Sequence, residues 1–268
     1  MSNPKVAVIG LGASGAFAAK AAYDMKCEVE VYVTQAGKMS PGATWLHWLP
    51  EDVTSQFTPT QIYVMGKGTS DQYTKRQWGK VYPSSFPVTP AWEVGYDPTQ
   101  VLEVLVPAAC NINMIPYPLS DADIRDLSVG FDLVFQTFPT RVSKEEQPPL
   151  RSFVAAAKLG QSDPEKNFVV YNGTKIGIVV REAQLFGNHF LEFPKDMTAE
   201  EVWDQQDLDG YQVVTLKDLD PSTKPWQTVR SRIKLIGRWA QWDRKILSHD
   251  AYAIAQKHVQ EFLDEQNS

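Results

Sequence analysis

Residues 6–34 read VAVIGLGASGAFAAKAAYDMKCEVEVYVT, and this stretch decides the fold. It opens with a short apolar run at 6–9, which is typical of a buried strand, and a second β-branched run follows at 29–33. The small residues between the two runs predict a helix that begins near Ala13. Strand, helix and strand within about 30 residues form a βαβ unit, so we predict an α/β, Rossmann-like fold with a parallel sheet.

Three glycines in G-x-G-x-x-G spacing, Gly10, Gly12 and Gly15, join the first strand to the helix. The first permits a tight turn, the second lets a pyrophosphate approach the backbone, and the third lets helix and strand pack closely. Ala13 and Ser14 then begin the helix, where unpaired N–H groups favour an anion. We therefore expect these five residues to bind a dinucleotide, the alternative being a tight turn without a ligand. The turn alone does not distinguish FAD from a nicotinamide.

The end of the second strand lacks the acidic residue that usually holds the adenosine ribose. The strand ends instead with Thr34 and Gln35. Either one of these two residues replaces the carboxylate, or the ribose is held elsewhere.

The composition limits the class of protein. A chain of 268 residues can bury the core of a nucleotide-binding domain and a small subdomain. Its net charge of −6 argues against broad binding to duplex nucleic acid, though not against a local basic groove. No apolar run approaches ~18 residues, so we expect no membrane span. Cys27 and Cys110 have no metal-ligand spacing and indicate buried free thiols, a reducing, cytoplasmic location and no metal site.

The rest of the chain predicts a second, inserted part. A strand at 131–135 returns beside the first strand, whereas 168–171 and 176–180 read as a hairpin around Asn172-Gly173. Residues 61–95 have no long period and read as loop and short helix, and a final helix starts near Ser248. The capping-box spacing from Thr198 to Glu201 predicts a further short, acidic helix. We assign the two parts as follows: a dinucleotide-binding domain of 1–60, 121–140 and 226–268, and a substrate-facing antiparallel β/helical subdomain with a lid, 61–120 and 141–225.

Two stretches carry candidate functional side chains. His47 lies between Trp45 and Trp48, where a histidine is more often structural than catalytic. Aromatic and basic residues mix at 73–78, a composition that suits stacking on a base together with contacts to phosphate. The alternative for this second stretch is a solvated basic loop with its rings turned inward.

Several separate stretches, in order along the chain, resemble the UDP-galactopyranose mutases, a family of FAD proteins related in fold to the amine oxidases. Residues 73–79, YTKRQWG, resemble the family's Y-T-x-K-Q-W-G motif, and 42–47, GATWLH, resemble its G-A-H-I-F-H segment. Arg181-Glu182 is similar to its T-R-x-x-E region. Gly237-Arg238, Trp242 and residues 248–250 resemble its terminal G-R…Y…D-M-D closure.

The resemblance implies FAD as the cofactor, ahead of NAD, and assigns site residues. The residues it places along the cofactor are Gly42, Ala43, Thr44, Gly237, Arg238, Ser248, His249 and Asp250. It places His47 at the flavin, as the candidate catalytic residue. The substrate-binding residues that it suggests are Tyr73, Lys75, Arg76, Trp78, Arg181, Trp242 and Arg244. The chain is shorter than the mutases in the substrate region, and the mutase tyrosine pair is replaced by Trp242 with Arg244 or Lys245.

From this we expect an FAD-dependent enzyme that oxidatively cleaves an amine or C–N bond on a nucleobase- or nucleotide-linked substrate. An example is an amino-acid-modified thymine in phage DNA, read as a single strand or a flipped base. Trp78 would stack on the base, Lys75 or Arg76 would meet phosphate, and His47 would lie near flavin N5. One alternative is a sugar-nucleotide mutase that uses reduced flavin. Another is a dinucleotide-binding protein without catalysis. Small molecules, nucleotides and modified bases are the expected partners, and the oligomeric state stays open.

Overall fold

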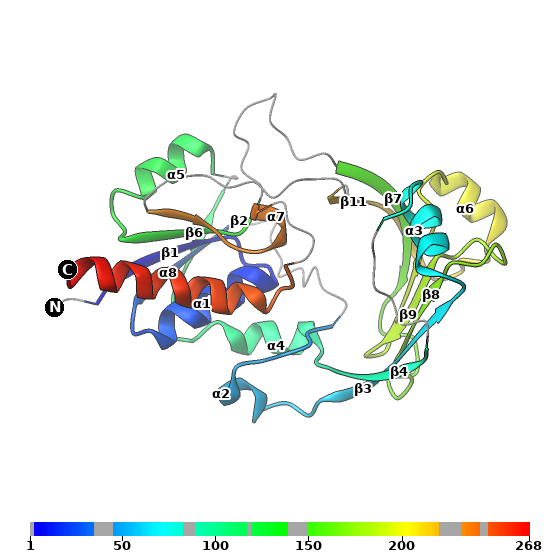
Figure 1. Cartoon of the computed structure of the whole chain (residues 1–268), viewed down its shortest axis with the longest axis horizontal. Coiled ribbons are helices and arrows are strands. Elements are labelled where there is room, and N and C mark those ends of the chain that lie inside the picture. The colour runs from blue at the N-terminus through cyan, green and yellow to red at the C-terminus, as the bar shows by residue number, and fades with distance from the viewer. Residues whose placement is uncertain are drawn as a thin grey trace. The chain divides into compact units, whose positions relative to one another are not determined.

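A computed structural model gives the structure of the chain, and it describes residues 3–34, 45–82, 89–116, 119–138, 150–219, 232–241 and 246–268 (Figure 1). The chain divides into two compact units. Unit 1 comprises Met1–Phe57, Asp97–Pro149 and Ser222–Ser268, and unit 2 comprises Thr58–Tyr96 and Leu150–Pro221. The predicted α/β class is confirmed, because unit 1 contains a parallel sheet and unit 2 a mixed one.

Unit 1 is built on five parallel strands in the order β12-β6-β1-β2-β5. The strands are β1 Lys5–Ile9, β2 Glu28–Thr34, β5 Asn111–Ile115, β6 Leu133–Gln136 and β12 Ile233–Leu235. Val6 pairs with Val29 of β2 on one side and with Leu133 of β6 on the other. The strand predicted at 131–135 thus lies beside β1, as expected, and begins at Leu133.

Helices cover both faces of this sheet, because successive side chains of β1 point to opposite faces. The helices of unit 1 are α1 Ala13–Asp24, α2 Glu51–Thr54, α4 Pro98–Leu105, α5 Asp121–Leu127, α7 Arg238–Gln241 and α8 Asp250–Gln266. Ala7 and Ile9 pack against Ile124 of α5. Helix α1 contacts α4 and α8 on the other side of the sheet (Figure 1). In the described part of the chain, no helix has both the length and the apolar character needed to cross a bilayer.

The strand order reverses beside β1. The chain moves outward from β1 to β2 and β5, and then returns to the other side of β1 to form β6 and β12. In open α/β sheets, ligands bind outside the carboxyl ends of the strands at such a switch point. The Gly-rich turn directly follows β1, so the topology places it at this point.

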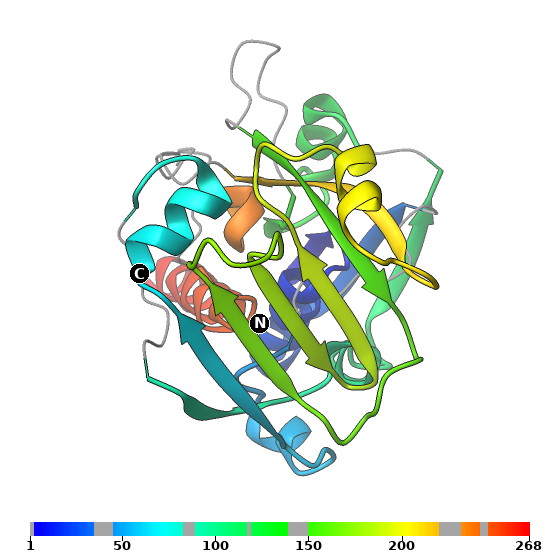
Figure 2. The same ribbon diagram turned by 90° about the vertical axis from the view of Figure 1, so that its right-hand side faces the viewer.

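Unit 2 is a seven-stranded mixed sheet in the order β11-β7-β10-β9-β8-β3-β4. Its elements are β3 Thr60–Lys67, α3 Ser70–Trp78, β4 Ala91–Gly95, β7 Leu150–Lys158, β8 Phe168–Asn172, β9 Arg181–Leu185, β10 Asn188–Glu192, α6 Ala199–Gln205 and β11 Gln212–Leu219. Helix α6 lies against this sheet (Figure 2), where its Val202 packs with Leu191 and Phe193. The sequence predicts this helix correctly from the capping box of Thr198 and Glu201.

The prediction of loop and short helix for 61–95 is confirmed for helix α3 but wrong for strands β3 and β4, which it misses. Strand β3 carries the fully buried side chains of Ile62 and Val64, and it pairs in parallel with β8, Tyr63 opposite Phe168. A partner about a hundred residues away stabilises this strand, and no local periodicity reveals such a partner.

Two further boundaries differ from the prediction. Residues 97–116 belong to unit 1, because β5 pairs with β2 at the edge of the parallel sheet, Glu30 opposite Asn111. The second strand of the predicted hairpin begins at Arg181, opposite Tyr171, and not at 176. The connection before it is held by side chains instead of a two-residue turn: the Asn172 amide donates to the carbonyls of Ile176 and Val179.

Candidate dinucleotide site and its surroundings

The Gly-rich turn leaves no room for side chains at its first and third glycines. Gly10 has a φ of 97°, a conformation that favours glycine, and its N–H donates to the Tyr32 carbonyl at 2.9 Å. A Cβ at Gly15 would overlap the Gly10 carbonyl oxygen and lie 3.0 Å from the Gly10 carbonyl carbon. The strand and the helix therefore approach as closely as the motif predicts.

Thr137 is a member of this turn that sequence reasoning missed. It directly follows β6, and its hydroxyl donates to the carbonyls of Ile9 at 2.9 Å and Gly10 at 3.3 Å. A Cβ at Gly10 would lie only 2.6 Å from Thr137 Oγ1. The signal was available, since a polar residue directly after a strand beside β1 must lie at the switch point.

The N-terminus of α1 presents backbone N–H groups without a side-chain cap. Gly12 is the N-cap in an extended conformation, and the first turn contains no acidic residue. Such a terminus carries a partial positive charge that an anion can satisfy. The residues present thus fit a pyrophosphate at this position.

The end of the chain approaches the same helix terminus. Gly237 has a φ of 90°, and a Cβ there would lie 2.6 Å from the Cβ of Ser14. Next to it, the Arg238 guanidinium donates from Nε to the Ile246 carbonyl at 3.4 Å. The structure therefore brings the predicted residues Gly237 and Ser14 together, although they are more than two hundred positions apart in the sequence.

Helix α8 begins beside an aromatic cluster that we define as Trp45, His47, Trp48, His249 and Tyr252. His249 is the N-cap of α8, and its ring centroid lies 6.1 Å from that of His47 and 6.3 Å from that of Trp48. Trp48 also contacts Tyr252, with centroids 5.4 Å apart. The predicted residue Asp250 accepts the Leu247 N–H at 2.7 Å and so stabilises the start of the helix.

A buried lysine stabilises the base of this cluster. Lys20 of α1 is 5% exposed and bonds to Asp24 at 2.7 Å and to Asp52 of α2 at 2.8 Å. Burial alone would lower the pKa of Lys20, but the two carboxylates outweigh it and the pKa is raised. Asp24 also accepts from Tyr252 at 2.7 Å, and burial together with this carboxylate raises the pKa of Tyr252. The network fixes α8 and α2 to α1, and no local sequence pattern indicates it.

In unit 2, the predicted substrate residues are engaged in internal contacts. Arg181 forms an ion pair with Glu192 at 2.8 Å, and its guanidinium lies 5.5 Å from the ring centroid of Tyr171. Burial disfavours the charged guanidinium, but Glu192 outweighs this effect and the pKa of Arg181 is raised. Tyr73 meets Tyr171 edge to face, at a centroid distance of 5.4 Å.

The other residues of the aromatic-basic stretch differ in exposure. Trp78 is 6% exposed, whereas Lys75 is exposed. Arg76 donates to the carbonyls of Asn172, Thr174 and Gly177, so its guanidinium holds the 172–177 loop. Substrate contacts by these residues stay predictions.

The fold has counterparts among solved structures. The chain superposes on p-nitrophenol 4-monooxygenase PnpA from Pseudomonas putida DLL-E4 with a TM-score of 0.53 and 13% identity, over 99% of this chain and 82% of that one. For the flavin-dependent halogenase CmlS the TM-score is 0.51 and the identity 16%, over 98% of this chain and 58% of the halogenase. For 2-methyl-3-hydroxypyridine-5-carboxylic acid oxygenase the TM-score is 0.50 and the identity 15%, over 95% of this chain and 82% of that one.

The chain has the fold of FAD-binding, Rossmann-type flavoproteins. No known family model and no curated protein sequence matches it. The flavoprotein fold is therefore recognisable from the structure at identities too low for a family assignment.

Some predicted residues lie outside the described part of the chain: Gln35, Gly42, Ala43, Thr44, Trp242, Arg244 and Lys245. Thr34 ends β2 opposite Ile115. The roles predicted for all of these residues stay predictions.

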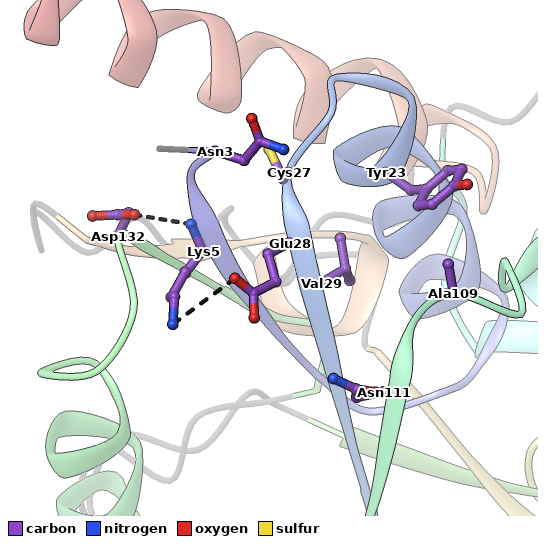
Figure 3. Close-up of a pocket in the computed structure, with 9 residues that line it drawn as sticks. All are labelled: Asn3, Lys5, Tyr23, Cys27, Glu28, Val29, Ala109, Asn111 and Asp132. Atoms are coloured by element: carbon purple, nitrogen blue, oxygen red, sulfur yellow. Dashed lines mark hydrogen bonds and ion pairs between the residues drawn. The ribbon is translucent and has the colours of Figure 1, made fainter. Parts of the chain in front are cut away.

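A surface hollow of about 650 Å³ lies at the opposite end of the parallel sheet (Figure 3). Its lining includes Lys5, Glu28 and Asn111, the first residues of β1, β2 and β5. Lys5 and Glu28 form an ion pair across it at 3.8 Å. Since the Gly-rich turn follows the carboxyl end of β1, this hollow is separate from the candidate dinucleotide site.

Proposed function

We propose that the chain is an FAD-dependent oxidoreductase. The observation that carries the proposal is the Gly-rich turn at the switch point, with Gly237 against Ser14 of the same helix terminus. Flavin-dependent halogenase CmlS and the two oxygenases share the fold, which supports a flavin over a nicotinamide.

FAD fits the residues present at the turn. The first and third glycines admit close backbone approach, and the uncapped N-terminus of α1 can receive the pyrophosphate. Thr137 fixes the carbonyls of Ile9 and Gly10, so it shapes the turn without contributing charge. When bound, FAD supplies the redox chemistry, and the protein orients it and excludes water.

The chain's own residues would then orient the flavin ring. Gly237 and Arg238 would lie along it, and His47 would place a polar group near it, supported by Trp45, His249 and α8. Gly237 lies against Ser14, and the Arg238 guanidinium bonds to the Ile246 carbonyl, so both residues are placed before a ligand binds.

For the substrate, we propose an amine or C–N bond on a nucleobase-linked compound, such as an amino-acid-modified thymine. The similarity of residues 73–79 to a nucleotide-binding motif supports this choice. If DNA carries the base, the net charge of −6 favours a single-stranded or flipped base over a duplex surface.

The first experiment is an absorbance spectrum of the purified full chain, with mass analysis of the cofactor released on denaturation. Gly15→Ala should abolish flavin retention, because its Cβ overlaps the Gly10 backbone, whereas Gly130→Ala is the matched control with its nearest atom at 3.7 Å. Wild-type protein that neither retains nor rebinds FAD would overturn the proposal.

A second experiment identifies the reaction. The flavin-loaded protein is given modified thymidines under air, or phenols under air together with a reduced nicotinamide as the electron donor, and oxygen uptake and products are measured. Uptake with release of a carbonyl product supports C–N cleavage, and incorporation of an oxygen atom into a phenol supports a monooxygenase instead. Conversion of a sugar nucleotide only after dithionite reduction would favour the mutase alternative.

A further inference from the structure

The hydrogen bond between Trp45 and His47 fixes the position of a proton. Trp45 Nε1 lies 3.1 Å from His47 Nδ1, and the two ring centroids are 5.0 Å apart. The indole N–H can only donate, so Nδ1 must accept and cannot carry a proton. A neutral imidazole carries its one proton on the other nitrogen, which here is Nε2.

We infer that Trp45 is a positioning residue that holds His47 as the neutral Nε2–H tautomer, so that His47 acts as a hydrogen-bond donor and not as a proton acceptor. If Nδ1 were protonated, two N–H donors would face each other without an acceptor, and the hydrogen bond to Trp45 would break. The direction of the Nε2–H donor toward a flavin or its substrate rests on the proposed function. The tautomer itself does not.

The surroundings of Trp45 and His47 support a fixed geometry. Trp45 is only 8% exposed, so its indole is held by packing, whereas the side chain of His47 is exposed. The His249 ring lies edge-on to His47 at a centroid distance of 6.1 Å, and His249 Nε2 lies 3.7 Å from the Asp250 carboxylate. The bond from the buried indole of Trp45 and the contact with the N-cap residue of α8 orient the exposed ring of His47.

This arrangement changes the chemistry expected of His47. A histidine near a flavin can accept a proton or donate a hydrogen bond, and the sequence leaves both open. Since Nδ1 is occupied by Trp45, the structure assigns the donor role.

The tautomer is measured directly by long-range ¹H–¹⁵N correlation spectroscopy of the full chain at pH 8, with and without FAD. The chain has four histidines, and a His47→Gln variant identifies the His47 signals. We expect a pyridine-type Nδ1 and a pyrrole-type Nε2 in the wild type.

Trp45→Phe should mix the two tautomers. The matched control is Trp48→Phe, which replaces the indole packed on His249 by a phenyl ring, leaves the bond between Trp45 and His47 in place, and should change neither nitrogen of His47. A pyrrole-type Nδ1 in the wild type, or an unchanged tautomer in Trp45→Phe, would overturn the inference even if FAD binds.

The donor role is tested with two neutral amides. The amide nitrogen of His47→Gln reaches the Nε2 position, whereas His47→Asn can only replace Nδ1 and its contact with Trp45. We expect the Gln variant to keep the FAD dissociation constant and the rate of flavin reoxidation by oxygen within about threefold of wild type, and the Asn variant to lose about threefold to tenfold, the size of one hydrogen bond. Retention in Asn but not Gln would reduce His47 to a structural anchor. Loss in both would indicate a proton acceptor. Either outcome contradicts the inference without contradicting the proposal that the chain binds FAD.

Discussion

Gly237 and Ser14 are in contact, although one follows the last strand of the parallel sheet and the other begins its first helix. A Cβ built on Gly237 lies 2.6 Å from the Cβ of Ser14, a distance that real Cβ atoms do not show, and Gly237 has a φ of 90°. Glycine at this position lets the segment after β12 approach the N-terminus of α1, where the pyrophosphate is expected.

Gly237→Ala should therefore destabilise the fold by about 1–3 kcal/mol, through overpacking and the positive φ, and should weaken FAD retention. Urea unfolding and flavin content measure the two effects. Ser14→Gly in the same chain removes the clashing side chain and should recover part of the loss. Gly130→Ala, where φ is not positive and the nearest atom is 3.7 Å away, should change neither quantity. A Gly237→Ala protein as stable as this control would show that the two elements do not meet.

Thr137→Val keeps the shape of the side chain but removes the hydroxyl that bonds the carbonyls of Ile9 and Gly10. Because those carbonyls lose a donor, we expect a loss of about 1–3 kcal/mol in the free energy of unfolding and weaker FAD binding. Thr137→Ser retains the hydroxyl and should stay close to wild type. Equal behaviour of the two variants would mean that the hydroxyl does not hold the turn.

Glu192→Gln leaves the Arg181 guanidinium without its carboxylate. Each side chain of the pair is 18% exposed, so we expect the free energy of unfolding to fall by an amount at the lower end of about 3–5 kcal/mol. Chemical denaturation measures it. Glu165→Gln, on the exposed surface of the same unit, is the control and should change stability by less than about 0.5 kcal/mol. If Glu192→Gln changes stability as little as the control does, Arg181 does not depend on this ion pair and could instead bind substrate.

The two buried thiols predict a loss of stability at alkaline pH. Burial raises the pKa of Cys27 and of Cys110 from 9.0 to about 11. Between these values the unfolded thiols ionise while the folded ones stay protonated. The thiol contribution is thus complete below pH 9 and is lost as the pH rises toward 11, at about 1.4 kcal/mol per pKa unit and thiol.

Urea unfolding of wild type and of the Cys27→Ala/Cys110→Ala protein, at intervals from pH 8 to pH 11, isolates this contribution from that of the tyrosines and lysines. The difference in stability between the two proteins should shrink with rising pH. A constant difference would mean that the thiols are not buried in the folded state.

The sequence by itself determined the βαβ unit around the Gly-rich turn. Its signals are local, because an apolar run, three glycines and a helix of small residues follow one another directly in the sequence. The first and third glycines meet their steric requirement there. The capping box at Thr198 and the strand that returns beside β1 were predictable for the same reason, because the deciding residues are neighbours in sequence.

Tertiary structure alone decided the rest. Strand β3 depends on β8, β5 depends on β2, and the contact of Gly237 with Ser14 depends on the whole parallel sheet between them. The sequence identified His47 but not its tautomer, because the proton position follows from the 3.1 Å contact with Trp45 and not from the spacing of the two residues. Local patterns specify which elements form, whereas pairing between distant segments specifies which side chains face one another.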